Sequence, residues 1–143
     1  MIARALVGGI ALALSACSAG GEPDPGEGPA AAEPASQPEA AVADLTTAEL
    51  ATRIADGSVT LIDVRTPEEF AEGHIEGAVL MPIDGFDPAK VPLAEGTQPV
   101  FYCRSGRRSL AAAEAWAEHS GEVAEHLEGG ILAWEKAGKP TVN

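Results

Sequence analysis

The chain contains, at residues 100–109, the segment VFYCRSGRRS, which joins an apolar run to a cluster of basic side chains. The apolar residues before Cys103 predict a buried strand, and the residues from Ser109 onward predict a helix. The loop between them carries three of the nine basic side chains of a chain whose formal net charge is −13. Positive charge gathered around one thiol in an acidic protein is therefore the feature that the rest of the sequence has to explain.

The loop from Cys103 to Arg108 has the features of an anion-binding site. Free backbone N–H groups at a helix N-terminus favour an anion, so they also favour thiolate over thiol and lower the pKa of Cys103. Gly106 lets the backbone curl where a side chain would obstruct it. An inert core cysteine is the alternative, and Arg104, Arg107 and Arg108 are alternatively a solvated, salt-bridged surface. We favour catalysis for Cys103 and a shared role for the arginines.

Strand and helix patterns alternate on both sides of this loop. Strands are expected at 41–43, 59–64, 78–83, 99–102 and 123–127, and helices at 46–56, 66–72, 109–118 and 130–137. Thr46 with Glu49 forms a capping box, and Thr66 precedes a proline in a second helix start. Such alternation predicts an α/β fold, with a parallel sheet covered by helices on both faces.

Chemistry in such sheets lies beyond the carboxyl ends of the strands. Three stretches fall there: Asp63 to Arg65, Cys103, and Glu128 with Gly129. For Asp63 and Arg65 a buried ion pair or loop brace is favoured over catalysis. His74 lies in a turn before a strand and is predicted to be a structural hydrogen-bonding residue rather than a general base.

The remaining histidines and the tryptophans carry simpler predictions. His119 and His126 are interpreted as surface residues, and Trp116 and Trp134 as core or interface aromatics. Three scattered histidines and one free cysteine do not make a metal site. The acidic balance argues against nucleic acid as a partner.

The N-terminal residues form a leader and a tether. A short cationic region precedes an apolar stretch too short to span a bilayer as a helix, and the stretch ends in LSAC at 14–17. This leader resembles a bacterial lipoprotein signal, which implies cleavage before Cys17 and lipidation of its thiol; an ordinary secretory leader is the alternative. The residue after Cys17 is Ser18; an Asp there would indicate retention in the inner membrane, so Ser18 favours the outer membrane. Residues 17–40 hold five prolines and no basic residue, so we expect a disordered linker.

The expected organisation is therefore a signal peptide at 1–16, a lipid-anchored linker at 17–40 and a domain at 41–143. The protein would be exported and held at the cell envelope, facing the periplasm. Cys103 would then be the one free thiol in an oxidising compartment, a liability unless the thiol has a function.

Four stretches of the domain carry a further signal: LIDVRTPEEF at 61–70, GHIEGA at 73–78, CRSGRR at 103–108 and LEGGILAW at 127–134. In their order and spacing they resemble a single-domain rhodanese, a family of sulfurtransferases. The family commonly has proline where this chain has Glu76. The resemblance covers about residues 43–142 and implies a five-stranded parallel sheet with helices on both faces.

The resemblance, with the loop chemistry, implies sulfur transfer through a persulfide on Cys103. The Cys103 thiolate would take a sulfane sulfur from thiosulfate or a similar small anionic donor and pass it to cyanide or a thiol. The substrate-binding residues would be those of the loop: Arg104, Ser105, Gly106, Arg107 and Arg108. Arg104 and Arg107 are candidates for the sulfonate end of the donor, and Arg108 for holding the loop or the persulfide. No organic cofactor or metal is required.

Two other functions compete with this one. A phosphatase or arsenate reductase of the same fold has five residues between its cysteine and the invariant arginine, whereas four separate Cys103 from Arg108. The second is a non-enzymatic persulfide carrier or partner-binding module. Inert members of the family usually lack the cysteine, which is present here, but a protein that mainly passes persulfide to a partner is left open.

Overall fold

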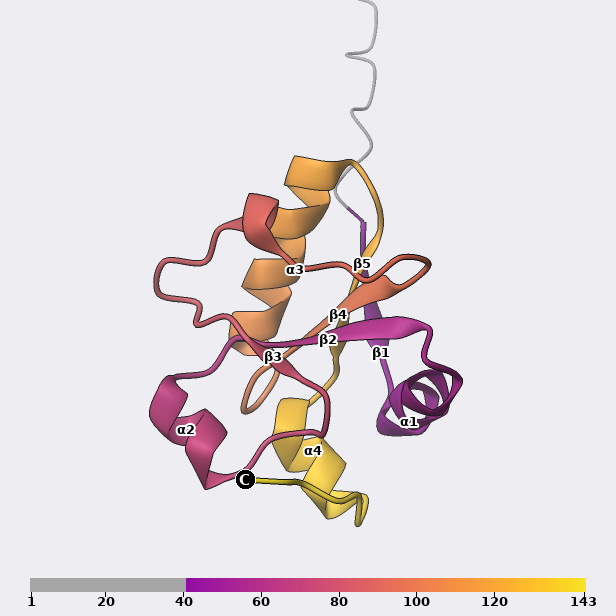
Figure 1. The fold of residues 1–143 in the computed structure, drawn as a ribbon, viewed down its shortest axis with the longest axis vertical. Helices are drawn as coiled ribbons and strands as arrows, with labels where there is room; N and C mark the ends of the chain where they lie inside the picture. Colours follow the sequence, from indigo (N-terminus) through magenta and orange to yellow (C-terminus); the bar gives the residue numbers. More distant parts are fainter. Residues whose placement is uncertain (1–40) are drawn as a thin grey trace, which may run out of the picture. The chain divides into compact units, whose positions relative to one another are not determined.

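Five parallel strands form one sheet in the part of the chain that the structure, a computed structural model, describes, which is residues 41–143. The predicted signal peptide at 1–16, the lipidation of Cys17 and the linker up to residue 40 lie outside the described residues. The spatial order is β1-β5-β4-β2-β3 (Figure 1). The strands span Val42–Leu45 (β1), Val59–Asp63 (β2), Val79–Leu80 (β3), Gln98–Tyr102 (β4) and Ala124–Leu127 (β5). The predicted α/β fold with a five-stranded parallel sheet is confirmed.

Four α-helices and one short 3₁₀ segment connect these strands. They span Thr47–Asp56 (α1), Pro67–Glu72 (α2), Pro88–Lys90 (η1, the 3₁₀ segment), Arg107–Ser120 (α3) and Gly130–Lys136 (α4). The predicted capping box of Thr46 with Glu49 is present, and Thr66 forms a second one with Glu69. Among the helices of residues 41–143, none is long and apolar enough to cross a bilayer.

Two apolar clusters cover the two faces of the sheet. Successive residues of β4 point to opposite faces, so Val100 and Tyr102 pack in one cluster while Phe101 and Cys103 pack in the other. The first cluster is covered by α1 and α4, and the second by α3 (Figure 1). Trp134 and Trp116 are buried in the first and second clusters respectively, as predicted for core aromatics.

Two elements differ from the predicted ones in ways that affect the site. Strand β3 has two residues instead of the expected six and lies at the sheet edge, although Met81 and Ile83 still donate to the carbonyls of Asp63 and Val64. Helix α3 begins at Arg107, two residues before the expected Ser109, after a left-handed Gly106. The non-helical loop after β4 is therefore confined to residues 103–106.

Candidate active site

Cys103 directly follows β4 at the carboxyl edge of the sheet, where topology predicts the chemistry to lie. The residue is 1% exposed and packs against Ile62, Val64 and the alanines of α3. The thiol is thus covered by the loop and the helix rather than open at the edge of the site. A substrate must reach it through the loop, so the loop decides access as well as charge.

Backbone amides of the loop surround the sulfur. The Gly106 amide donates a hydrogen bond to Cys103 Sγ at 3.1 Å. Burial raises the pKa of the thiol, but hydrogen bonds from the amide and hydroxyl of Ser109 and from the Gly106 and Ser105 amides outweigh it, so the net pKa lies below its ordinary value. The cysteine has an apolar wall on one side and a row of donors on the other.

The first turn of α4 holds the backbone of the loop. The amide of Ile131 donates to the Cys103 carbonyl at 2.8 Å, and the amide of Leu132 donates to the Arg104 carbonyl at 3.2 Å. Gly130 makes this approach possible, because a Cβ there would lie 2.4 Å from the Cys103 carbonyl oxygen. The sequence did not single out Gly130 for this role, although the pair Gly129-Gly130 after β5 could have indicated a close backbone contact.

The three loop arginines lie in different surroundings. Arg108 is half-buried and makes two hydrogen bonds, at 2.7 and 2.8 Å, to the carboxylate of Glu69 in α2. This hydrogen bonding to Arg108 lowers the pKa of Glu69 to about 2. Arg104 and Arg107 are exposed and make no ion pair within residues 41–143. The predicted shared cluster is thus divided into one tethered guanidinium and two free ones.

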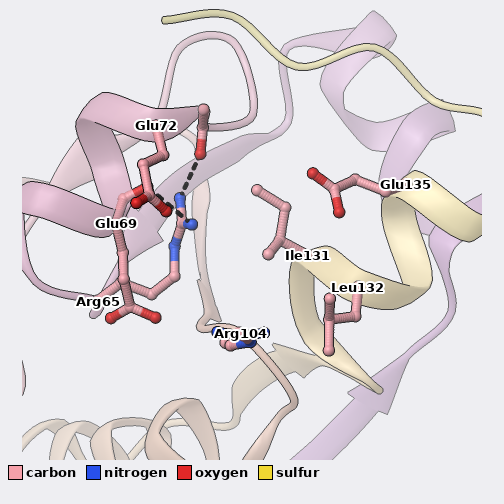
Figure 2. A pocket seen from close by; sticks show the side chains of 8 residues that line it. Arg65, Glu69, Glu72, Arg104, Ile131, Leu132 and Glu135 are labelled. Carbon is pink, nitrogen blue, oxygen red and sulfur yellow. Dashed lines mark hydrogen bonds between the residues drawn. The ribbon is translucent and has the colours of Figure 1, made fainter.

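A pocket of about 190 Å³ lies beside the loop, between α2 and α4. Figure 2 shows Glu69 and Glu72 on one side, Glu135 with two apolar side chains of α4 on the other, and Arg104 at the base. Arg104 is the loop residue that lines this pocket, and Cys103 does not. The pocket therefore meets the loop at the residue next to the cysteine.

Asp63 and Arg65 form the expected buried ion pair, with Arg65 Nη2 2.6 Å from Asp63 Oδ2. The guanidinium also donates to the carbonyls of Glu69 at 3.1 Å and Gly73 at 2.8 Å (Figure 2). Burial by itself lowers the pKa of Arg65, but hydrogen bonding and charge from Asp63 more than reverse this, so the pKa is raised. The pair fixes α2, and with it Glu69, relative to the end of β2.

A rhodanese-like domain model matches residues 46–137 of the chain. The chain belongs to the rhodanese-like family. It is 34% identical over 102 residues to a sulfurtransferase of Allochromatium vinosum, covering 71% of this chain and 95% of that protein. The human single domain sulfurtransferase TSTD1 superposes with a TM-score of 0.56 at 28% identity, covering 65% of this chain and 95% of the human one.

Other relatives are longer than this chain. An uncharacterized protein of Synechocystis is 45% identical over 85 residues, which is 59% of this chain and 48% of that protein. The chain thus spans about half the length of the Synechocystis relative but nearly all of the sulfurtransferase.

The rhodanese-like domain uses its histidines in unlike ways. His74 is stacked on Phe70, with ring centroids 3.7 Å apart, and its Nδ1 lies 3.1 Å from the Phe70 carbonyl oxygen. Its backbone pairs with Val142, so its contacts are those of the predicted structural residue. His119 is exposed, as expected. The surface prediction for His126 is wrong: the residue is 5% exposed and faces α3 from β5.

The alternation of side chains along β5 could have predicted that His126 is buried. Ala124 and His126 share a sheet face, and Ala124 is fully buried, so His126 is directed under α3. Glu69 was not singled out as a site residue from the sequence, and its pairing with Arg108 joins positions 39 residues apart. Sequence spacing gives no signal for that contact.

Proposed function

We propose that the chain is a sulfurtransferase that transfers a sulfane sulfur through a persulfide on Cys103. Sulfurtransferase activity has support at the level of the family, from relatives that match along nearly their whole length. The observation that carries the proposal to this chain is the Gly106 amide 3.1 Å from a thiol whose pKa lies below its ordinary value. A thiolate is the form that attacks sulfur.

The first half-reaction forms the persulfide. The Cys103 thiolate attacks the outer sulfur of thiosulfate, a new S–S bond forms to Sγ, and the old S–S bond breaks as sulfite leaves with the electron pair. The negative charge then rests on the terminal sulfur of the persulfide. The amides that stabilise the thiolate also suit this anion, because both are anionic sulfur held at a helix N-terminus.

The second half-reaction returns the thiolate. Cyanide or a thiolate acceptor attacks the terminal sulfur, and Cys103 leaves as the thiolate with its electron pair. Arg104 and Arg107 are suited to attract the sulfonate end of the donor, because both are exposed and free of ion pairs within the described residues. Ser105 and Gly106 contribute backbone donors, while Arg108 holds the loop through Glu69.

The test is to treat the pure protein with thiosulfate and measure its mass. We expect a gain of one sulfur atom that cyanide removes as thiocyanate, and no gain in Cys103→Ser. A wild-type protein that gains no sulfur and forms no thiocyanate would overturn the proposal. Turnover of a chromogenic phosphate ester would instead favour the phosphatase alternative.

A persulfide carrier is separated from an enzyme by the rate of the second step. We expect transfer to cyanide or to a small dithiol to be catalytic, with many turnovers per protein molecule. A single stoichiometric transfer with both acceptors would favour the carrier.

We also propose that the protein is exported and held at a membrane by lipid on Cys17. The sequence from the cationic start to LSAC at 14–17 supports this. In a bacterial host, the wild-type chain should partition into the detergent phase, and Cys17→Ser should move to the aqueous phase. Equal partitioning of the two would contradict the anchor.

A further inference from the structure

His126 is a buried ionisable residue that the proposed reaction does not use. Both of its ring nitrogens have partners: Nε2 lies 2.7 Å from Asp44 Oδ1, and Nδ1 lies 3.3 Å from Ser109 Oγ. Asp44 is directly beside His126 in the pairing of β1 with β5, and its side chain is 70% exposed. The imidazole therefore connects a carboxylate at the surface to a hydroxyl in the interior.

Ser109 lies between this imidazole and the sulfur of Cys103. The serine is fully buried, its hydroxyl is 2.9 Å from the Gly106 carbonyl oxygen, and both its amide and its hydroxyl lower the pKa of Cys103. A serine hydroxyl has one hydrogen to donate. The acceptors that compete for this hydrogen are His126 Nδ1, the Gly106 carbonyl oxygen and the cysteine sulfur.

The proton on His126 decides this competition. The Asp44 carboxylate only accepts, so Nε2 carries a hydrogen in either state of the ring. When the ring is neutral, Nδ1 is an acceptor and takes the Ser109 hydrogen away from the sulfur. When the ring is protonated, Nδ1 donates to Ser109 Oγ, and the hydroxyl hydrogen is released to the Gly106 carbonyl and the sulfur.

We propose that Asp44, His126 and Ser109 form a hydrogen-bond relay that sets how strongly Cys103 is held as a thiolate, with His126 as its positioning residue. The relay deepens the proposed sulfur transfer and rests on it for its purpose. Protonation of His126 adds a donor to the sulfur, and by linkage the thiolate stabilises the protonated ring. Reactivity at Cys103 thus follows the protonation state of a histidine that never contacts substrate.

Few other ionisable groups act on His126. In residues 41–143, the elements packed around it present Asp44 from β1 and, through Ser109, Cys103 from the end of β4. Arg108 of α3 also interacts with Cys103 and is itself paired with Glu69. Its partner on β4 is Phe101, and α3 contributes the neutral side chains of Ala112 and Ala113 to the same cluster. A substitution of Asp44 should therefore change the relay without disturbing the apolar packing around His126.

The test measures the alkylation rate of Cys103 by iodoacetamide against pH, beside the NMR titration of the His126 ring. In the wild type we expect an inflection in the rate at the pH where His126 titrates. Asp44→Asn removes the ionic partner of the ring, so the two inflections should move together to lower pH. Asp56→Asn is the matched control, since it removes an exposed carboxylate elsewhere and should move neither.

Ser109→Ala separates the relay from simple proximity. The ring of His126 stays in this variant, but its inflection should disappear from the Cys103 profile, and the thiol pKa should rise because two of its hydrogen-bond donors are weakened or lost. The inference is overturned if Asp44→Asn shifts the His126 titration while the Cys103 profile stays as in the wild type, or if the wild type has no such inflection. Alkylation needs no sulfur donor, so a protein that shows the relay but forms no persulfide would refute only the proposed function.

Discussion

The segments that leave the adjacent strands β2 and β4 occupy the same edge of the sheet and do opposite things with charge. After β2, Asp63 and Arg65 neutralise each other in a buried ion pair, and the guanidinium donates its remaining hydrogen bonds to backbone carbonyls. After β4, the buried thiol takes hydrogen bonds from the amides of Ser105, Gly106 and Ser109 and from the Ser109 hydroxyl. The guanidinium of Arg108 also interacts with the sulfur, but its ion pair is with Glu69. The segment after β2 thus contains a permanently paired acid and base. The segment after β4 provides hydrogen-bond donors for a sulfur whose negative charge changes during the reaction.

The difference separates stability from reactivity. A buried ion pair whose hydrogen bonds are all made resists change, because removing either partner leaves an uncompensated charge. Amides fixed by the fold favour an anion, and the nearby Arg108 is already paired with Glu69, so the sulfur is stabilised without an ion pair of its own. Glu69 and Arg108 lie between these cases, since they tie α2 to the first turn of α3 near the surface.

Arg65→Ala should produce the largest loss of stability. It leaves Asp63 buried without its partner, and we expect the free energy of unfolding to fall by about 3–5 kcal/mol in urea titrations. Arg53→Ala is the control, because the Arg53–Glu125 pair is partly exposed and should cost about 1 kcal/mol or less. Similar losses in the two variants would show that the segment after β2 is not special.

Gly130→Ala should be the next most damaging change. The new Cβ would lie 2.4 Å from the Cys103 carbonyl oxygen at a φ of +60°, so the loop has to move; we expect a loss of about 2–3 kcal/mol and a changed alkylation rate at Cys103. Gly138→Ala has a similar φ of +71° with nothing within 4 Å of the added Cβ, so backbone strain alone should cost about 1 kcal/mol. An unchanged alkylation rate in Gly130→Ala would contradict the role of α4 in holding the loop.

Glu69→Gln should cost about 1–2 kcal/mol at neutral pH. Because the pKa of Glu69 is lowered to about 2, its contribution is fully present above its ordinary value of 4.5 and is lost as the pH falls through about 2. The stability difference between wild type and variant, measured by urea titration at several pH values, should therefore shrink between these limits. A difference that is constant with pH would mean that the ion pair contributes nothing.

Arg104→Ala should have the smallest effect on stability, below about 0.5 kcal/mol, because the side chain is exposed. Its expected effect is on the donor: the KM for thiosulfate should rise by about fivefold as one exposed positive charge is lost. Lys136→Ala, which removes an exposed charge from α4 outside the pocket lining, is the control for general electrostatics. Equal effects in the two variants would remove Arg104 from substrate binding.

Much of the fold was predictable because its signals are local. The capping residues Thr46 and Thr66 mark the starts of their helices through residues within four positions of each threonine. The apolar run ending at Cys103 predicts a buried strand. The topology then places Cys103 at the carboxyl edge without any knowledge of side-chain contacts. The early start of α3 depends on Gly106, whose effect extends only to its neighbours.

The site was less predictable because its contacts are long-range. Glu69 meets Arg108, Gly130 meets Cys103, and Asp44 meets His126 only once the sheet is assembled. The burial of the thiol also depends on packing. The position of Cys103 at the end of a strand suggested an accessible side chain, but α3 and the loop cover it. Residue type indicated the chemistry, whereas tertiary packing set the burial and the donors.

The most direct measurement is the pKa of the Cys103 thiol, followed by the ultraviolet absorbance of the thiolate and by alkylation rates across pH. The amides around the sulfur predict a midpoint clearly below the value of about 8.5 for a free cysteine. A midpoint at or above that value would mean that burial prevails over the loop amides, and it would contradict the account of this site.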